Sequence, residues 1–214
     1  MSPVVLRGPN LGKGYFKKVR DKVKKGFIFV ISGPSGSGKT TIAKRLLQQP
    51  QLKGKLIKPA SFTTRPKRQG ERQGRDYFFV SKTEFQGLLK AKKILEQTRY
   101  LSYDYGTSRS AVQRAIKNGL HAILCLDIKG ASFIKQTYPK RAITIFVKIP
   151  SLSVAKQRIL SRSNKTTAEE VRRRMQLAKK ELTHVKRYNY CLLNDNLNKA
   201  IREAREIIQW TIYQ

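Results

Sequence analysis

Acidic residues are scarce in this sequence of 214 residues. Lys and Arg number 46 against 13 Asp and Glu, which gives a formal net charge of +33. Solubility requires a far smaller charge, and an excess of this size is typical of proteins that bind a polyanion. The sequence therefore favours a nucleic acid, and RNA in particular, as a partner of the basic surface.

Long apolar runs and cysteines are also scarce. No stretch reaches the roughly eighteen apolar residues of a membrane-spanning helix, so we expect no membrane partner. The two cysteines, Cys125 and Cys191, lie far apart in apolar stretches, which favours buried free thiols over a disulfide or a metal site. Free thiols indicate an intracellular, reducing compartment, either the cytoplasm or the mitochondrial matrix. Nothing in the sequence indicates an oligomeric state.

Residues 1–26 form a basic N-terminal extension with eight Lys and Arg residues and one acidic residue. Three interpretations fit this segment: an organelle-targeting sequence, an arm that becomes ordered on RNA, and a solvated tail. The remainder, residues 27–214, is predicted to form one domain, because 39% apolar residues supply enough side chains for a core.

The strongest local signal is a glycine-rich segment at residues 33–40, GPSGSGKT. An apolar run rich in β-branched and aromatic residues precedes it, at Phe27–Ser32, and apolar residues recur at helical spacing after it. The segment matches G-x-x-x-x-G-K-[ST], and the predicted strand and helix supply the context that this motif requires. We therefore predict a phosphate-binding loop.

Each residue type in this loop suits a triphosphate. Glycines permit positive φ angles that turn backbone N–H groups toward an anion at the start of a helix. Lys39 supplies a charge for the outer phosphates, and the Thr40 hydroxyl is a suitable ligand for Mg²⁺, so ATP and Mg²⁺ are expected. The predicted phosphate-binding residues are Gly33, Ser35, Gly36, Ser37, Gly38, Lys39, Thr40 and Thr41.

Strand and helix patterns alternate along the rest of the chain. Helices are predicted at Lys82–Lys92, Ser108–Gly119, Ala131–Gln136, Ser151–Ser161 and Asn196–Tyr213, and from Thr167, where Glu170 gives capping-box spacing. Strands are predicted at Asp76–Val80, His121–Ile128, Arg141–Ile149 and Tyr190–Leu193. The alternation predicts an α/β fold with a parallel sheet covered by helices on both faces, interrupted by a small β-rich insertion.

A second group of motifs lies beyond the phosphate-binding loop. It comprises SFTTRPKRQGE at residues 61–71, GRDYFF at 74–79, Glu96, YGT at 105–107, Asp127 with Gly130, and Asn194 with Asp195. In order and nearly in spacing, these motifs resemble guanylate kinases, which are P-loop nucleoside monophosphate kinases. The resemblance covers about residues 26–208. It implies a core at 27–58 and 108–160, a GMP-binding insertion at about 59–107, a lid at about 161–180 and a C-terminal part of the core at 181–214.

The resemblance also implies a pocket for GMP. Arginines and hydroxyls suit its phosphate, and carboxylates accept hydrogen bonds from the N1–H and N2–H groups that distinguish guanine from adenine. The implied GMP-binding residues are Ser61, Arg65, Arg68, Glu71, Tyr77, Glu96, Tyr105, Thr107 and Asp127. The implied catalytic residues, which neutralise charge on the transferred phosphoryl group, are Lys39, Arg65, Arg158, Arg162 and Arg174.

The few acidic residues are distributed unevenly. Five of the 13 fall at positions matching family motifs: Glu71, Asp76, Glu96, Asp127 and Asp195. Asp76 and Asp195 also fit purely structural roles as caps or ion-pair partners. Cys125, in contrast, stands where the family usually has an acid. A thiol is a poor Mg²⁺ ligand, so weaker metal binding and slower turnover are expected; simple packing of a small strand residue is the alternative.

These observations predict a guanylate kinase, an enzyme that phosphorylates GMP to GDP with ATP. The alternative is a guanylate-kinase-fold protein that serves as a component of a ribonucleoprotein, including an organellar ribosome. Such a protein binds nucleotide with reduced or no turnover and contacts RNA through its basic surface and N-terminal arm. A protein–protein scaffold is disfavoured, because inactive guanylate-kinase-like modules lack a working phosphate-binding loop.

Overall fold

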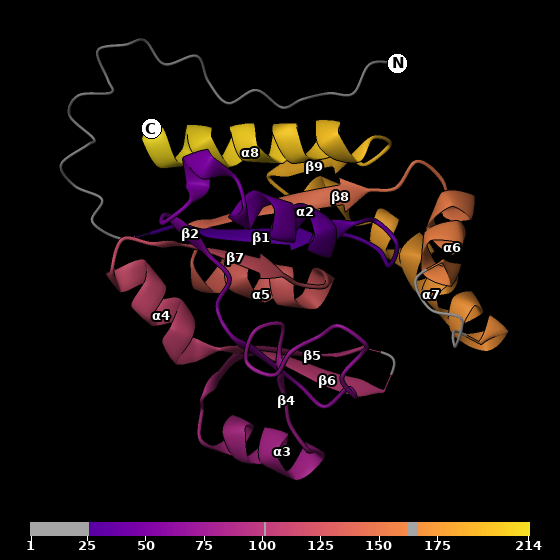
Figure 1. The fold of residues 1–214 in the computed structure, drawn as a ribbon, viewed down its shortest axis with the longest axis horizontal. Helices are drawn as coiled ribbons and strands as arrows, with labels where there is room; N and C mark the ends of the chain where they lie inside the picture. Colours follow the sequence, from indigo (N-terminus) through magenta and orange to yellow (C-terminus); the bar gives the residue numbers. More distant parts are fainter. Residues whose placement is uncertain (1–25, 101, 162–166) are drawn as a thin grey trace.

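The computed structural model describes residues 26–100, 102–161 and 167–214 (Figure 1). The predicted N-terminal extension, apart from residue 26, and the predicted catalytic residue Arg162 lie outside the described residues. Within the described ranges, no helix has both the length and the apolar content needed to cross a bilayer.

A five-stranded parallel sheet forms the centre of the larger part of the fold. Its strands are ordered β2 (Leu56–Ile57), β7 (His121–Cys125), β1 (Ile28–Ser32), β8 (Ala142–Lys148) and β9 (Tyr190–Leu193). All five residues of β1 are buried, because this central strand is covered on both faces. The predicted parallel sheet is confirmed.

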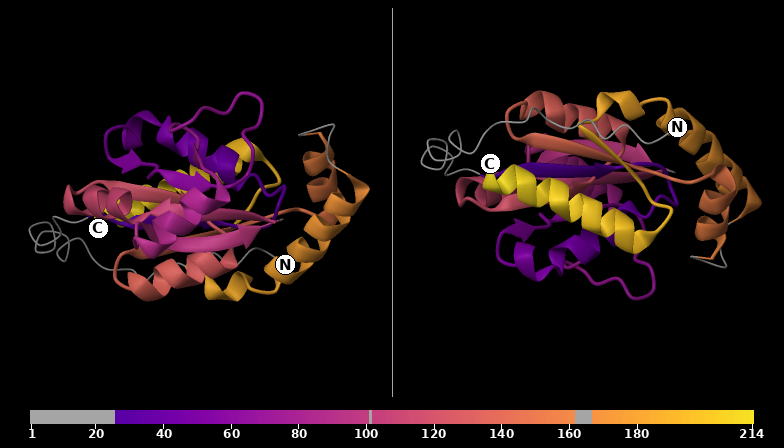
Figure 2. Two further views of the ribbon diagram at one scale, coloured as in Figure 1. Left: turned by 90° about the horizontal axis from the view of Figure 1, so that it is seen from below. Right: turned by 90° about the horizontal axis from the view of Figure 1, so that it is seen from above.

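Helices cover both faces of this sheet, as predicted (Figures 1 and 2). Helices α2 (Lys39–Leu47) and α8 (Leu197–Tyr213) pack on one face with Phe29 and Ile31 of β1. Helices α4 (Arg109–Lys117) and α5 (Ile128–Thr137) pack on the other with Ile28 and Val30. Alternate side chains of one strand therefore supply two separate cores.

A second, four-stranded mixed sheet lies on the far side of α5 from β1 (Figure 1). Its order is β4 (Phe78–Phe79), β3 (Ser61–Thr63), β6 (Tyr103–Ser108) and β5 (Ile94–Tyr100), and α3 (Lys82–Lys90) follows β4 in the chain. The sequence predicts a β-rich insertion here, but its pattern does not predict β5 and β6 as separate strands. Their sequences, ILEQTRY and YDYGTS, mix polar and aromatic residues without a continuous apolar run.

Helices α6 (Leu152–Leu160) and α7 (Ala168–Leu182) lie beyond the carboxyl end of β8 and extend to one side of the sheet (Figure 2). Thr167 caps α7 by accepting a hydrogen bond from the Glu170 amide at 3.2 Å. The Glu170 carboxylate forms an ion pair with Arg174. Two short 3-10 helices, at Pro50–Leu52 and Val185–Arg187, complete the described fold.

Some predicted boundaries are wrong. Strand β7 ends at Cys125 and not at Ile128, because Asp127 caps α5, which begins at Ile128 and not at Ala131. The predicted strand Asp76–Val80 contains only the two residues of β4.

The prediction of two buried thiols is also wrong for one of them. Both cysteines are free, and Cys125 is partly buried, but Cys191 is exposed. Strand β9 lies at the edge of the sheet, and its alternation turns Leu192 inward and Cys191 outward.

Candidate active site

The loop between β1 and α2 brings glycine backbone close to its neighbours. Gly33 has φ +143° and Gly38 has φ +87°, conformations that favour glycine. A Cβ atom at residue 33 would lie 2.4 Å from the Val147 carbonyl oxygen, and one at residue 38 would lie 2.3 Å from Nδ2 of Asn194. Helix α2 then begins at Lys39, and among the described residues no side chain caps it, so its first amides suit an anion.

Two residues distant in sequence stabilise this loop by donating hydrogen bonds to its backbone carbonyls. Asn194, which is buried, donates from Nδ2 to the Ser37 carbonyl at 2.7 Å. Arg158 of α6 donates to the carbonyl of Gly36 at 3.5 Å and to that of Asn194 at 3.1 Å. In the described structure Arg158 therefore contacts the back of the loop, and it does not line either cavity described below.

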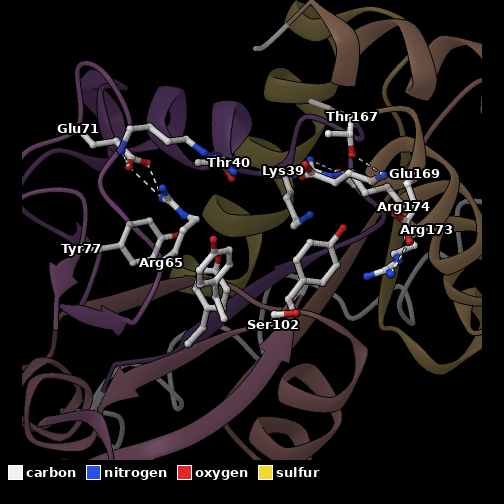
Figure 3. Close-up of a pocket in the computed structure, with 16 residues that line it drawn as sticks. Lys39, Thr40, Arg65, Glu71, Tyr77, Ser102, Thr167, Glu169, Arg173 and Arg174 are labelled. Atoms are coloured by element: carbon white, nitrogen blue, oxygen red, sulfur yellow. Dashed lines mark hydrogen bonds and ion pairs between the residues drawn. The ribbon is translucent and has the colours of Figure 1, made fainter. Parts of the chain in front are cut away.

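A cavity of about 440 Å³ opens in front of the loop. Figure 3 shows Lys39 between two groups of side chains, with Arg65, Glu71 and Tyr77 on one side and the α7 residues on the other. The predicted site residues that line this cavity are Ser35, Lys39, Thr40, Arg65, Arg68, Glu71, Tyr77, Tyr105 and Arg174.

Arg65 and Glu71 form an ion pair in this cavity. Nη2 of Arg65 lies 2.8 and 2.9 Å from the two carboxylate oxygens of Glu71, and the Arg68 amide donates to Glu71 at 2.9 Å. Burial favours the protonated acid, but the bonds from Arg65 and Arg68 outweigh it and lower the pKa of Glu71. Arg65 is thus held in a fixed position with its guanidinium 5.8 Å from the Tyr77 ring.

A second, smaller cavity of about 150 Å³ adjoins the first. Lys39, Thr40, Tyr77 and Tyr105 line both, so the two form parts of one cleft. The predicted site residues that line the smaller cavity are Gly33, Ser35, Lys39, Thr40, Ser61, Tyr77, Glu96, Tyr105, Thr107 and Asp127. Of the predicted phosphate-binding residues, Gly36, Ser37, Gly38 and Thr41 line neither cavity.

Glu96 is a buried carboxylate in the smaller cavity. Its Oε1 accepts a hydrogen bond from the Thr107 hydroxyl at 2.6 Å, and its Oε2 has no partner among the described residues. Burial, with a smaller contribution from Asp127, raises the pKa of Glu96 to about 7. A Cβ atom at residue 130 would lie 2.8 Å from Oε2, which explains the glycine there. An acceptor with an unsatisfied oxygen is available for a ligand with N–H donors.

Asp127 both caps helix α5 and lines the smaller cavity. It caps α5 by accepting from the Gly130 amide at 2.8 Å, and its other oxygen accepts a hydrogen bond from the Thr98 hydroxyl. The cap fixes the carboxylate at the carboxyl edge of the parallel sheet, where ligands bind in open α/β folds.

Helix α7 contributes Arg174 to the cleft from the side opposite Arg65. Nη1 of Arg174 donates to the Ser35 hydroxyl at 3.2 Å, and Nη2 pairs with Glu170. Arg173, which is not among the predicted catalytic residues, also lines the larger cavity and pairs with Glu169.

Among the residues that line the smaller cavity, Lys58, Tyr100 and Glu181 were not predicted as site residues. Burial raises the pKa of Glu181 to about 7, although Lys39 opposes this shift. One available signal was the scarcity of acids, since Glu181 is one of only 13 acidic residues in the chain. Lys58 and Tyr100 gave no such signal among many lysines and tyrosines.

Cys125 packs against the core of the sheet and also lines the smaller cavity. Its thiol donates to the Lys39 carbonyl at 3.9 Å, and burial raises its pKa, with Lys39 and Lys58 opposing. The group at this position is therefore a neutral thiol at neutral pH, a poor magnesium ligand.

The donor set suits a magnesium ion that arrives with a nucleotide. Among the described residues, no group of three or more His, Cys, Asp and Glu side chains is placed to hold a metal ion. Thr40, however, lines the cleft beside Lys39. Mg²⁺ commonly takes one or two protein ligands and completes its shell with phosphate oxygens and water, so these residues fit the ion.

Asp76 and Asp195 have structural roles in the described part of the chain. Asp76 accepts hydrogen bonds from the Arg72 amide, Lys44 and Arg75, and only 8% of its side chain is exposed. Asp195 is 43% exposed and lies 3.8 Å from Lys199.

We expect Asp76→Asn to lower the free energy of unfolding at pH 7 by about 1–3 kcal/mol, measured by urea denaturation. The expected loss of stability is modest because the side chains of Lys44 and Arg75 are each 56% exposed, so solvent screens their charges. Despite burial, the hydrogen bonds from Arg72, Lys44 and Arg75 hold the pKa of Asp76 well below its usual range. The wild-type protein is therefore more stable than Asp76→Asn above about pH 4, and this difference in the free energy of unfolding shrinks as the pH falls below 4.

Asp195→Asn is the control for this experiment and should change stability by less than about 0.5 kcal/mol. An equal effect of the two substitutions at neutral pH would contradict the assignment of Asp76 as a buried structural anion.

Comparison with known proteins gives a consistent result. A family model described as guanylate kinase matches residues 25–211. A guanylate kinase of Clostridium tetani is 39% identical over 186 residues, covering 87% of this chain and 86% of that protein. One of Desulfitobacterium hafniense is 40% identical over 185 residues, covering 86% and 89%. The crystal structure of guanylate kinase from Anaplasma phagocytophilum superposes with a TM-score of 0.73 at 25% identity, covering 89% of this chain and 88% of that one.

Proposed function

The chain belongs to the guanylate kinase family of ATP:GMP phosphotransferases, and we propose which of its residues bind the two nucleotides and transfer the phosphoryl group. The observation that carries the assignment is that Glu96, a buried acceptor with an unsatisfied oxygen, lines the same cleft as Lys39 of the phosphate-binding loop.

The loop at residues 33–41 binds the phosphates of ATP. Its backbone amides and the start of α2 face the anion, and Lys39 places an ammonium group beside the transferred phosphate. The Thr40 hydroxyl would hold Mg²⁺, which neutralises phosphate charge when it is bound. Arg158 supports the loop, and Arg174 reaches it from α7.

GMP binds on the opposite side of the cleft. Arg65, Arg68, Tyr77 and Tyr105 surround its phosphate, and Glu71 holds Arg65 in position. Glu96 and Asp127 accept from the guanine N–H groups, and Ser61 and Thr107 add polar contacts. In this proposal the small sheet is the GMP-binding insertion of about residues 59–107, and residues 161–180 form the lid.

Positioning and charge neutralisation are sufficient for the reaction. The γ-phosphoryl group leaves ADP and bonds to a phosphate oxygen of GMP, so no covalent intermediate on the protein is needed. Lys39, Arg65 and Arg174 approach the space between the two phosphates from three separate elements.

A coupled assay of ADP release tests the proposal. With ATP, Mg²⁺ and GMP the protein should release ADP at a rate proportional to its concentration, and AMP in place of GMP should give at least about 100-fold lower kcat/KM. Folded protein that releases no ADP with GMP, or that accepts AMP equally well, contradicts the assignment.

We propose RNA as an additional partner on one observation, the net charge of +33. Phosphate transfer between two nucleotides requires only the few cations of the cleft, so most of the surplus lies elsewhere on the protein. An RNA-bound enzyme, including one in a mitochondrial ribonucleoprotein, is compatible with the kinase activity. The free thiols of Cys125 and Cys191 suit a reducing compartment.

We expect affinity for a fluorescently labelled single-stranded RNA to fall about 1,000-fold between roughly 50 and 200 mM salt, as measured by anisotropy. Removal of residues 1–26 takes seven positive charges from the net total and should weaken RNA binding and flatten the salt dependence. It should leave GMP phosphorylation within about threefold of the full-length value. Salt-independent binding, or loss of kinase activity with retained RNA affinity, would contradict this division of roles.

A further inference from the structure

Lys58 is a basic residue in the cleft for which the proposed function has no role. It directly follows β2, which pairs in parallel with β7, so Lys58 and Cys125 lie at the same carboxyl edge of the sheet. The smaller cavity is lined by Lys58 together with Lys39 and Thr40 of the phosphate-binding loop and Tyr77 and Tyr105 of the GMP side. Lys58 therefore stands where the two nucleotide sites adjoin.

The contacts of Lys58 fix its ammonium group without neutralising it. Nζ donates to the backbone carbonyl of Asp76 at 3.0 Å and lies 4.9 Å from the centre of the Tyr77 ring. No carboxylate among the described residues forms an ion pair with it, because the Asp76 side chain is engaged by Lys44, Arg75 and the Arg72 amide. Two of its three N–H donors remain for other acceptors.

The surroundings of Lys58 disfavour its charge in the absence of a ligand. Burial, with an added effect of Lys44, lowers the pKa of Lys58, although the carboxylates of Asp76 and Glu71 oppose the shift. Cys125, at the end of β7, lines the same cavity, and its thiol is neutral at neutral pH because burial raises its pKa. A half-buried cation that faces a cavity without an ion-pair partner is stabilised when an anion enters that cavity.

We propose that Lys58 is a further phosphate-binding residue, whose ammonium group contacts phosphoryl oxygens between the two nucleotides. This role rests on the proposed function of the cleft. The role also explains why a thiol, and not a carboxylate, lines the cavity with Lys58. A carboxylate at residue 125 would compete with phosphate for the Lys58 ammonium group. The anion is either the phosphate of GMP or the γ-phosphate of ATP, and the experiment separates the two.

Lys58→Gln is the informative variant, because glutamine keeps a donor for the Asp76 carbonyl and removes the charge. Because this variant loses a charge-assisted hydrogen bond to phosphate, we expect kcat/KM for the nucleotide that Lys58 contacts, GMP or ATP, to fall by about 10- to 100-fold. Lys58→Arg should recover a large part of this loss. The matched control is Lys44→Gln, which removes a charge that also contacts Asp76 but does not line the cleft, and it should stay within about threefold of wild type.

Calorimetric titration identifies the phosphate. Weaker binding of GMP with unchanged binding of guanosine assigns Lys58 to the GMP phosphate, and weaker binding of ATP with unchanged binding of ADP assigns it to the γ-phosphate. A lower kcat with all four affinities unchanged also supports the proposal and indicates a contact made in the transition state. These titrations remain decisive if the protein fails to phosphorylate GMP, so failure of the proposed function and failure of the role of Lys58 are distinguishable.

The proposal is overturned if Lys58→Gln matches Lys44→Gln in kcat/KM and in all four affinities. It is also overturned if guanosine binding weakens as much as GMP binding, since the effect then does not involve phosphate.

Discussion

Lys39→Ala should reduce kcat for GMP phosphorylation by at least about 1,000-fold. Lys39 lies at the centre of the cleft between Arg65 and Arg174 (Figure 3). In the proposed function its ammonium group supplies a charge to the phosphoryl group during transfer. Loss of one preorganised donor at the site of charge development costs about 100- to 1,000-fold, and loss of a full positive charge costs more. Initial rates in the coupled assay at saturating ATP and GMP give kcat directly.

The control for this variant is Arg45→Ala, which removes an exposed positive charge from the same helix without touching either cavity. It should leave kcat within about twofold of wild type. If Lys39→Ala retains more than about a tenth of the wild-type kcat while its thermal unfolding is normal, the phosphate-binding loop is not the transfer site.

The second large effect is expected for Glu96→Gln, which should lower kcat/KM for GMP by about 100-fold or more. The wild-type carboxylate can accept from both guanine N–H donors, and hydrogen bonds to charged groups contribute about 1.5–3 kcal/mol each. The amide replaces one acceptor oxygen with a donor, which opposes an N–H group of guanine. KM for ATP should change little, because the phosphate-binding loop is intact.

The pH dependence gives an independent test of the same residue. Burial raises the pKa of Glu96 to about 7, so lowering the pH protonates it and removes the acceptor that we propose for GMP. Between about pH 8 and pH 6 the affinity of wild type relative to Glu96→Gln should fall about tenfold. The ratio cancels the titration of the GMP phosphate, which both proteins experience. Glu181→Gln should keep this pH dependence, although Glu181 has a similar pKa.

The fold was predictable wherever local pattern and burial agree. Strand β1 and helix α2 flank a loop in which Val147 and Asn194 leave no room for a Cβ atom at residues 33 and 38. The glycine spacing and the apolar pattern on either side therefore both predict the same strand, loop and helix. The edge strand β9 shows the limit of this reasoning. Its apolar sequence predicts burial of Cys191, but position in the sheet decides which face is covered, and only the tertiary structure supplies that information.

The candidate site was predictable where it follows a family motif. Such motifs led to Arg65, Glu71 and Glu96, which the structure brings to one cleft. They did not lead to Lys58 or Glu181, whose importance depends on which side chains surround them. A single lysine among 46 basic residues carries no signal until the fold places it in one cavity with Cys125, Lys39 and Tyr105.

The binding of a bisubstrate ligand, adenosine and guanosine joined 5′ to 5′ through five phosphates, tests the central claim most directly. If the loop at Lys39 and the pocket at Glu96 face each other across one cleft, calorimetry should show one equivalent bound at least about 100-fold more tightly than ATP or GMP, with Lys39→Ala and Glu96→Gln each abolishing the gain. Binding no tighter than that of ATP, or a gain that survives both substitutions, would contradict the account.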